Sequence, residues 1–116
     1  MQRVAFTLQV KPERIAEYRE RHAAVWPSML EAIEAAGRRN YSLFLREDGL
    51  LFGYYETDDD AASQAALAAD PRTAPWEAEM SDFFIDADGR PDQAATPLES
   101  VFNLEDQLRA LREERP

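Results

Sequence analysis

His22 is the only histidine in the chain and therefore the only side chain whose ordinary pKa lies near neutrality. Its spacing from Ile15, Tyr18 and Val25 places all four residues on one stripe of a helix. We therefore expect the imidazole to face the interior of the fold. Partial desolvation there would keep His22 neutral at pH 7 and available for proton transfer. The alternative is a partly buried histidine that a backbone carbonyl or a tyrosine hydroxyl satisfies without any chemistry.

Aromatic side chains with polar tips are predicted to gather around this histidine. Tyr18 lies one helical turn before His22, so the two side chains are neighbours. Tyr41 opens a predicted strand and could approach the same space from a sheet. Aromatic faces with hydroxyl tips suit a sugar ring, which both stacks and forms hydrogen bonds. Trp26 is predicted to pack at a helix kink, whereas Trp76 fits packing and a binding platform equally well.

Composition excludes several other classes of site. The net charge of −10 disfavours binding to nucleic acid and to anionic membrane surfaces, because both require an excess of cations. The absence of cysteine excludes disulfides, thiolate nucleophiles and iron–sulfur clusters, and a single histidine excludes histidine-rich metal sites. No dinucleotide, P-loop or nucleophile-elbow motif occurs, so we expect neither a metal nor a cofactor. The longest apolar run is far shorter than a membrane span, and no secretory signal is visible, so a cytoplasmic protein is expected.

The first half of the chain shows three clear local patterns. Alternation of apolar and polar residues predicts a strand at residues 3–10. A helical pattern begins at Glu13 and must break at Pro27, because proline clashes with the carbonyl four residues before it. A second helical piece then runs to Gly37, which is the natural stop.

The second half begins with a hairpin signal. Residues 41–45 and 50–55 are predicted to be antiparallel neighbours, because the Asp48-Gly49 step between them is typical of a tight turn. The following aspartates at 58–60 offer N-caps for an alanine-rich helix at 61–69. The remaining predicted elements are a helical stretch through Trp76 and Met80, a polar loop at 86–97, a short last strand at 100–104, and an amphipathic helix or frayed end from Glu105.

This order is β-α-β-β-α-β, an α+β, ferredoxin-like arrangement with a four-stranded antiparallel sheet and helices on one face. The strands at 41–45 and 50–55 carry large apolar residues on both faces, whereas the helices can cover only one. The simplest cover for the second face is another copy of the chain, which would make a homodimer through the sheet faces, a dimeric α/β barrel.

Several spaced motifs in the chain are identified with one family. They are Tyr18-x-x-x-His22, Val25-Trp26-Pro27, Gly37-x-x-Asn40-Tyr41, Leu50-Leu51-Phe52, Trp76-x-x-x-Met80 and Leu98-x-x-Val101-Phe102. Together they resemble the L-rhamnose mutarotase family over about residues 1–104, which we expect to form one domain with residues 105–116 as a tail. The resemblance implies a dimeric ferredoxin-like enzyme that interconverts the anomers of a deoxy sugar without a metal or an organic cofactor.

The resemblance also implies roles for individual residues. The family's proton-donating histidine falls on His22, and its sugar-contacting tyrosines fall on Tyr18 and Tyr41. Its two adjacent tryptophans fall on Trp76 and Glu77, so this chain has a carboxylate at the second position. Glu77 would weaken stacking and add a hydrogen-bond acceptor, which changes what the sugar site recognises.

The predicted function is an aldose 1-epimerase acting on L-rhamnose or a close relative, with His22 as the acid that protonates the ring oxygen. Two other classes remain open from the residues alone. A small dimeric ferredoxin-like protein could be a monooxygenase or a haem-handling enzyme with His22 as an axial ligand. It could also be a non-catalytic dimer that binds a metabolite, with His22 in a structural role.

Overall fold

The computed structural model describes residues 1–85 and 95–114, so most of the predicted polar loop lies outside the described residues. The elements are β1 (Gln2–Gln9), the short 3₁₀ turn η1 (Pro12–Arg14), α1 (Ile15–Ala23), α2 (Pro27–Ala35), β2 (Arg39–Leu45), β3 (Leu50–Thr57), α3 (Asp60–Ala69), α4 (Thr73–Ser81), β4 (Thr96–Leu98) and α6 (Leu104–Glu114). Within these two ranges, every helix is too short or too polar to cross a bilayer.

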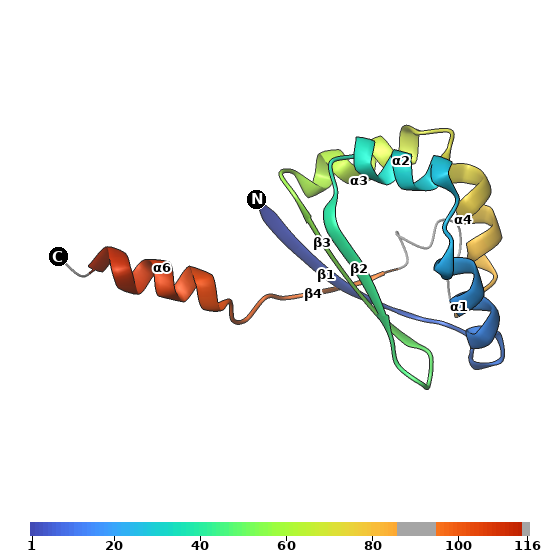
Figure 1. Cartoon of the computed structure of the whole chain (residues 1–116), viewed down its shortest axis with the longest axis horizontal. Helices are drawn as coiled ribbons and strands as arrows, with labels where there is room; N and C mark the ends of the chain where they lie inside the picture. Colours follow the sequence, from blue (N-terminus) through green and yellow to red (C-terminus); the bar gives the residue numbers. More distant parts are fainter. Residues whose placement is uncertain (86–94, 115–116) are drawn as a thin grey trace.

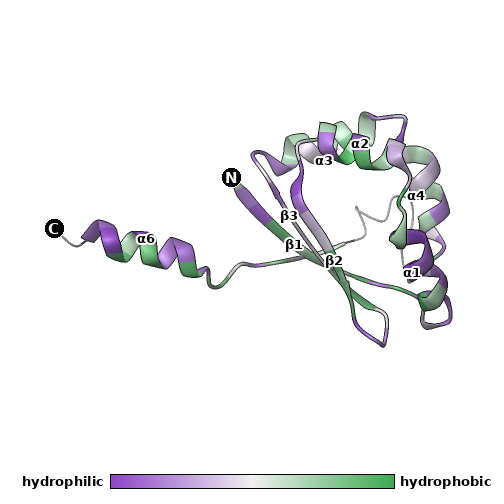
Figure 2. Ribbon diagram, viewed as in Figure 1, coloured by the Kyte–Doolittle hydropathy of each residue, from purple (hydrophilic) through white to green (hydrophobic). Residues whose placement is uncertain are grey.

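The four strands form one antiparallel sheet in the order β2-β3-β1-β4. Figure 1 shows α1, α2, α3 and α4 on one side of this sheet, while α6 projects away from the rest of the fold. The predicted α+β, ferredoxin-like arrangement is confirmed. Figure 2 shows that hydrophobic residues concentrate in the half of the strands that leads to the β2–β3 hairpin.

Local signals explain where most elements begin and end. Pro27 is the first residue of α2, so the predicted break between the two helical pieces is confirmed. The Asp59 side chain accepts a hydrogen bond from the Ala62 amide at 3.1 Å and caps α3. In the hairpin, Gly49 has a φ of +96°, a conformation that favours glycine, and the Arg46 amide donates to the Leu50 carbonyl.

The helix-facing side of the sheet is shaped by a glycine opposite an aromatic ring. Phe6 on β1 pairs with Gly53 on β3, which in turn pairs with Leu43 on β2. A Cβ atom at Gly53 would lie 2.2 Å from the Phe6 ring, so only glycine leaves room for this ring to lie flat on the sheet. Phe6 is buried there and forms part of the floor beneath the helices.

The last strand lies earlier in the chain than the sequence predicted. Residues 96–98 form β4 and pair with residues 5–7 of β1, whereas residues 100–103 are not in a strand. If this register continued, Phe102 would lie opposite Met1, which precedes β1. Residues 102–104 of the predicted strand therefore have no partner in β1. Pro97 is tolerated because β4 is an edge strand. The segment that follows becomes the helix α6, one of the two outcomes foreseen for it.

The opposite side of the sheet, here called the outer face, exposes large apolar side chains. Phe44 and Phe52 pair across β2 and β3 with their rings 6.5 Å apart, and they are 62% and 38% exposed. Leu98, opposite Ala5, adds a third apolar side chain that is 42% exposed. The described helices leave this face open, as the sequence pattern predicted.

Candidate functional site

A cavity of about 410 Å³ lies between the helix-facing side of the sheet and the helices α1, α2 and α4. This volume falls within the ~300–1,000 Å³ range of small-molecule sites. The lining is mostly aliphatic and aromatic and consists of Phe6, Leu8, Tyr18, His22, Val25, Met29, Leu30, Ile33, Tyr41, Leu43, Leu51, Trp76, Glu77, Met80 and Phe84.

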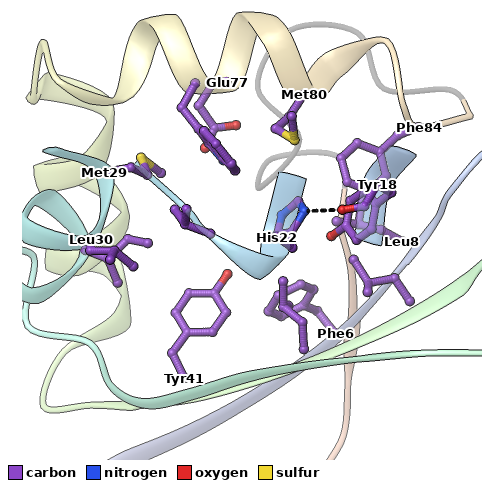
Figure 3. Close-up of a pocket in the computed structure, with 15 residues that line it drawn as sticks. Phe6, Leu8, Tyr18, His22, Met29, Leu30, Tyr41, Glu77, Met80 and Phe84 are labelled. Carbon is purple, nitrogen blue, oxygen red and sulfur yellow. Dashed lines mark hydrogen bonds between the residues drawn. The ribbon is translucent and has the colours of Figure 1, made fainter. Parts of the chain in front are cut away.

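His22 comes from the last turn of α1 and is held from two sides. Its ring stacks on Tyr18 with centroids 4.0 Å apart and meets Trp76 edge to face at 5.4 Å. Its Nδ1 atom lies 3.1 Å from the Tyr18 carbonyl oxygen (Figure 3). Since a carbonyl oxygen only accepts, Nδ1 carries a proton, and in the neutral ring Nε2 is then an acceptor.

Burial favours the neutral form of this ring. Desolvation lowers the pKa of His22 below its usual value, and the hydrogen bond to the Tyr18 carbonyl opposes this only in part. The neutral imidazole, with an accepting Nε2, is therefore the form present at pH 7. A base with its lone pair in an apolar cavity is suited to taking a proton from a bound hydroxyl.

Two tyrosines place phenol groups near the histidine. Tyr18 is buried, and this burial raises the pKa of its hydroxyl, with a smaller contribution from Tyr41. Tyr41 rises from β2 with its hydroxyl pointing into the cavity (Figure 3). Its ring packs edge-on against Phe6 and lies 5.3 Å from the ring of Tyr55. The Tyr18 phenol therefore stays protonated at neutral pH and can donate as well as accept hydrogen bonds.

α4 contributes an aromatic side chain and a carboxylate to the same cavity. Trp76 is buried, and its ring packs edge to face against Trp26, at 5.1 Å. Trp76 therefore both supports the fold and lines the site. Glu77 is partly buried, and Figure 3 shows it hanging from α4 above the cavity. The structure thus brings all five residues named from the sequence, His22, Tyr18, Tyr41, Trp76 and Glu77, to one lining.

A buried cation behind Tyr41 was missed by the sequence reasoning. Arg38 is only 7% exposed, and its Nε donates to the Ser63 hydroxyl at 2.9 Å. Its guanidinium lies 4.0 Å from the centre of the Tyr55 ring and 5.9 Å from that of Tyr41. Arg38 therefore supports the pair of rings that presents the Tyr41 hydroxyl. Because it precedes another arginine just after a helix end, nothing in the sequence distinguishes it from a solvated residue.

The other missed lining residues are apolar. Met29, Met80 and Phe84 are buried members of the core that also border the cavity. Apolar periodicity is the signal that could have pointed to Met29 and Met80, but it cannot separate a core position from a pocket wall. In the described part of the chain, no group of three or more His, Asp or Glu side chains is placed to hold a metal ion.

Comparison with known proteins places this geometry in a family. Residues 3–104 match the sequence profile of L-rhamnose mutarotase. The chain is 37% identical over 106 residues to the L-rhamnose mutarotase of Rhizobium meliloti (strain 1021), covering 90% of this chain and 99% of that protein. It is also 37% identical over 108 residues to that of Jannaschia sp. (strain CCS1), with the same coverage.

The chain belongs to the L-rhamnose mutarotase family. The crystal structure of L-rhamnose mutarotase FA22100 from Formosa agariphila superimposes with a TM-score of 0.72 at 26% identity, over 90% of this chain and 99% of that one. Rv0793 from Mycobacterium tuberculosis shares the fold alone, with a TM-score of 0.52 and 14% identity. These relatives give no support to the haem-handling or monooxygenase alternatives. The family match ends at residue 104, so α6 extends beyond it.

Proposed function

We propose that this protein is a mutarotase that interconverts the α and β anomers of L-rhamnose or a closely related deoxy sugar. The observation that carries the proposal is the hydrogen bond from Nδ1 of His22 to the Tyr18 carbonyl. In the neutral imidazole this bond leaves Nε2 as an acceptor, in an aromatic-walled cavity of about 410 Å³. Membership of the L-rhamnose mutarotase family agrees with this chemistry.

His22 supplies the proton transfer that ring opening requires. Nε2 takes the proton of the anomeric hydroxyl while the C1–O1 bond becomes a carbonyl and the C1–O5 bond breaks. The imidazolium so formed gives the same proton to the ring oxygen, which is the acid role expected from the sequence. Rotation about C1–C2 then presents the other face of the aldehyde, and the reverse steps close the ring. A general acid–base group of this kind contributes roughly 10²- to 10⁴-fold in rate.

The surrounding residues hold the sugar in place. The Tyr18 and Tyr41 hydroxyls orient the sugar hydroxyls, and Trp76 forms an apolar wall for the ring or its methyl group. Glu77 adds a carboxylate to this wall and favours a sugar that presents a hydroxyl to it. The identity of the sugar therefore depends on Glu77 more than on the residues around His22.

We also propose that two copies pair through their outer faces. Exposed Phe44, Phe52 and Leu98 on that face support this arrangement, because a second identical sheet is a matching apolar cover. A light-scattering mass of one chain at micromolar concentration would contradict it. We assign the protein to the cytoplasm, where a chain without cysteine loses nothing to the reducing conditions.

The test of the reaction is anomer exchange followed by saturation-transfer NMR on L-rhamnose. His22→Ala should abolish the enhanced exchange while circular dichroism shows an intact fold. Arg19→Ala, an exposed position on the same helix, is the matched control and should leave the rate unchanged. Full exchange by the His22→Ala variant would refute the role of the imidazole. A panel of deoxy and ordinary hexoses in the same assay identifies the sugar.

A further inference from the structure

The strand β2 contains an irregularity near the cavity. Residues 39 and 42 of β2 pair with residues 56 and 54 of β3, so three steps along β2 match only two steps along β3. One residue of β2 is therefore extra, which defines a β-bulge. Asn40, within this bulge, has a φ of +50° and is the only residue other than glycine with a positive φ in the described part of the chain. The fold accordingly holds an uncommon backbone conformation beside the site.

The bulge decides which side chains face the cavity. Side chains of a regular strand alternate between its two sides, so residues three apart, such as Arg38 and Tyr41, would point in opposite directions. With the extra residue both lie on the helix-facing side, where Tyr41 lines the cavity and Arg38 is buried. Asn40 and Arg39 lie on the outer face, where Asn40 donates to Glu56 at 3.2 Å and Arg39 is exposed.

Arg38, once turned inward, supports the ring behind the Tyr41 hydroxyl. Its guanidinium lies 4.0 Å from the centre of the Tyr55 ring, and its Nε donates to Ser63 of α3 at 2.9 Å. The Tyr55 hydroxyl donates to Asp60, which also belongs to α3. The Tyr55 ring, held at these two points, lies 5.3 Å from the Tyr41 ring. Contacts with α3 therefore fix the side chain whose hydroxyl points into the cavity (Figure 3).

We propose that Asn40 and Arg38 are positioning residues for the sugar and act through Tyr41. The left-handed conformation of Asn40 brings Arg38 and Tyr41 to the same side, and Arg38 then limits the directions in which the Tyr41 hydroxyl can point. The inference rests on the mutarotase function proposed above, because Tyr41 is the residue through which both act on a sugar hydroxyl. A hydroxyl held in place before binding loses less conformational freedom, so the two residues raise the affinity for the sugar without taking part in proton transfer.

Substitutions at Asn40 test the bulge. Asn40→Gly and Asn40→Val both lose the hydrogen bond to Glu56, but only valine disfavours a positive φ, so the glycine variant is the matched control. Asn40→Val should raise the KM for anomer exchange of L-rhamnose about tenfold with little change in kcat, which is the effect of losing one binding hydrogen bond. Asn40→Gly should keep the KM within about threefold of that of the unmodified chain.

The milder variant Asn40→Ala covers the case in which the valine variant does not fold. Its KM should lie between those of the glycine and valine variants, because alanine disfavours a positive φ less than a β-branched residue does. Circular dichroism identifies the variants that fold. Equal KM values across the folded variants would overturn the role of the bulge.

A double-mutant cycle tests whether Arg38 acts through Tyr41. Tyr41→Phe removes the hydroxyl and keeps the ring. Arg38→Met should raise the KM about fivefold to tenfold in the unmodified chain and less than about twofold in the Tyr41→Phe background, where no hydroxyl remains to be positioned. Arg39→Met, at the exposed neighbour on the outer face, is the control and should leave the KM unchanged. Equal effects of Arg38→Met in both backgrounds would show that Arg38 only stabilises the fold.

The position of the Tyr41 ring gives a readout that does not depend on the reaction. This ring packs edge-on against Phe6 with centroids 6.4 Å apart, so nuclear Overhauser contacts between the two rings are expected. Asn40→Val should lose these contacts and Asn40→Gly should keep them. Contacts that persist in a folded Asn40→Val variant would refute the role of the bulge. An unmodified chain without anomer exchange would refute the mutarotase proposal and the positioning of a sugar, while the ring contacts would still decide whether the bulge directs Tyr41.

Discussion

Removal of the buried cation behind the site should destabilise the protein measurably. Arg38→Met keeps the apolar stem of the side chain but deletes the guanidinium. The variant loses the hydrogen bond to Ser63 at 2.9 Å and the contact with the Tyr55 ring at 4.0 Å. It also leaves the buried Ser63 hydroxyl without this donor. The change therefore affects the support of Tyr41 without touching the cavity lining itself.

The size of the effect follows from these contacts. A hydrogen bond to a charged group contributes about 1.5–3 kcal/mol, and a desolvated cation–π contact contributes up to about 2 kcal/mol. The variant no longer has to bury a cation, which offsets part of the loss. We expect a decrease of about 2–3 kcal/mol in the free energy of unfolding, read from urea titrations as a shift of the midpoint at constant slope.

The neighbouring arginine provides the control. Arg39 pairs with Asp58 at 3.0 Å, but the two side chains are 51% and 83% exposed, so Arg39→Met should cost less than about 1 kcal/mol. A double-mutant cycle of Arg38→Met with Ser63→Ala isolates the hydrogen bond. The reasoning is refuted if Arg38→Met costs less than about 0.5 kcal/mol, or no more than Arg39→Met.

Three further outcomes follow from the same structure. The kcat/KM for anomer exchange should fall as pH drops through the lowered pKa of His22, because the neutral ring is the active form. The midpoint of this fall should lie below the usual histidine pKa near 6.5. A midpoint above that value would contradict the assignment. Gly53→Ala should cost about 1–3 kcal/mol in urea unfolding, because its Cβ would lie 2.2 Å from the Phe6 ring; a neutral effect would show that the ring can move. Glu77→Trp should shift the ratio of kcat/KM values for deoxy over fully hydroxylated hexoses about tenfold toward the deoxy sugar, or about 1.4 kcal/mol, whereas Glu77→Gln keeps the acceptor and should shift it less.

Much of the fold could be predicted because its signals are local. Proline cannot continue a helix, so the break at Pro27 could be read from one residue. The Asp48-Gly49 turn and the cap at Asp59 likewise depend on neighbours within a few positions. The last strand could not be placed this way, because strand formation needs a partner and β1 has no residues left opposite 102–104.

The arrangement of the site could likewise be predicted only where it depends on local spacing. Tyr18 and His22 are four residues apart on one helix, so their proximity was predictable from spacing alone. The approach of Tyr41 to them depends on how β2 and α1 are arranged around the cavity. Arg38 could not be distinguished from Arg39 in the sequence, since its burial results from Tyr55 and Ser63, which are distant in the chain.

The sequence by itself determined the order of the elements, the helical stripe that carries His22, and the acidic, cysteine-free composition, because each depends on residue type and short spacing. The tertiary structure decided that the pKa of the imidazole falls, since desolvation acts only once α1 is packed over the sheet. It also decided that α6 projects away from the other helices (Figure 1). Pairing and burial are relations between distant segments, and only the folded chain brings those segments together.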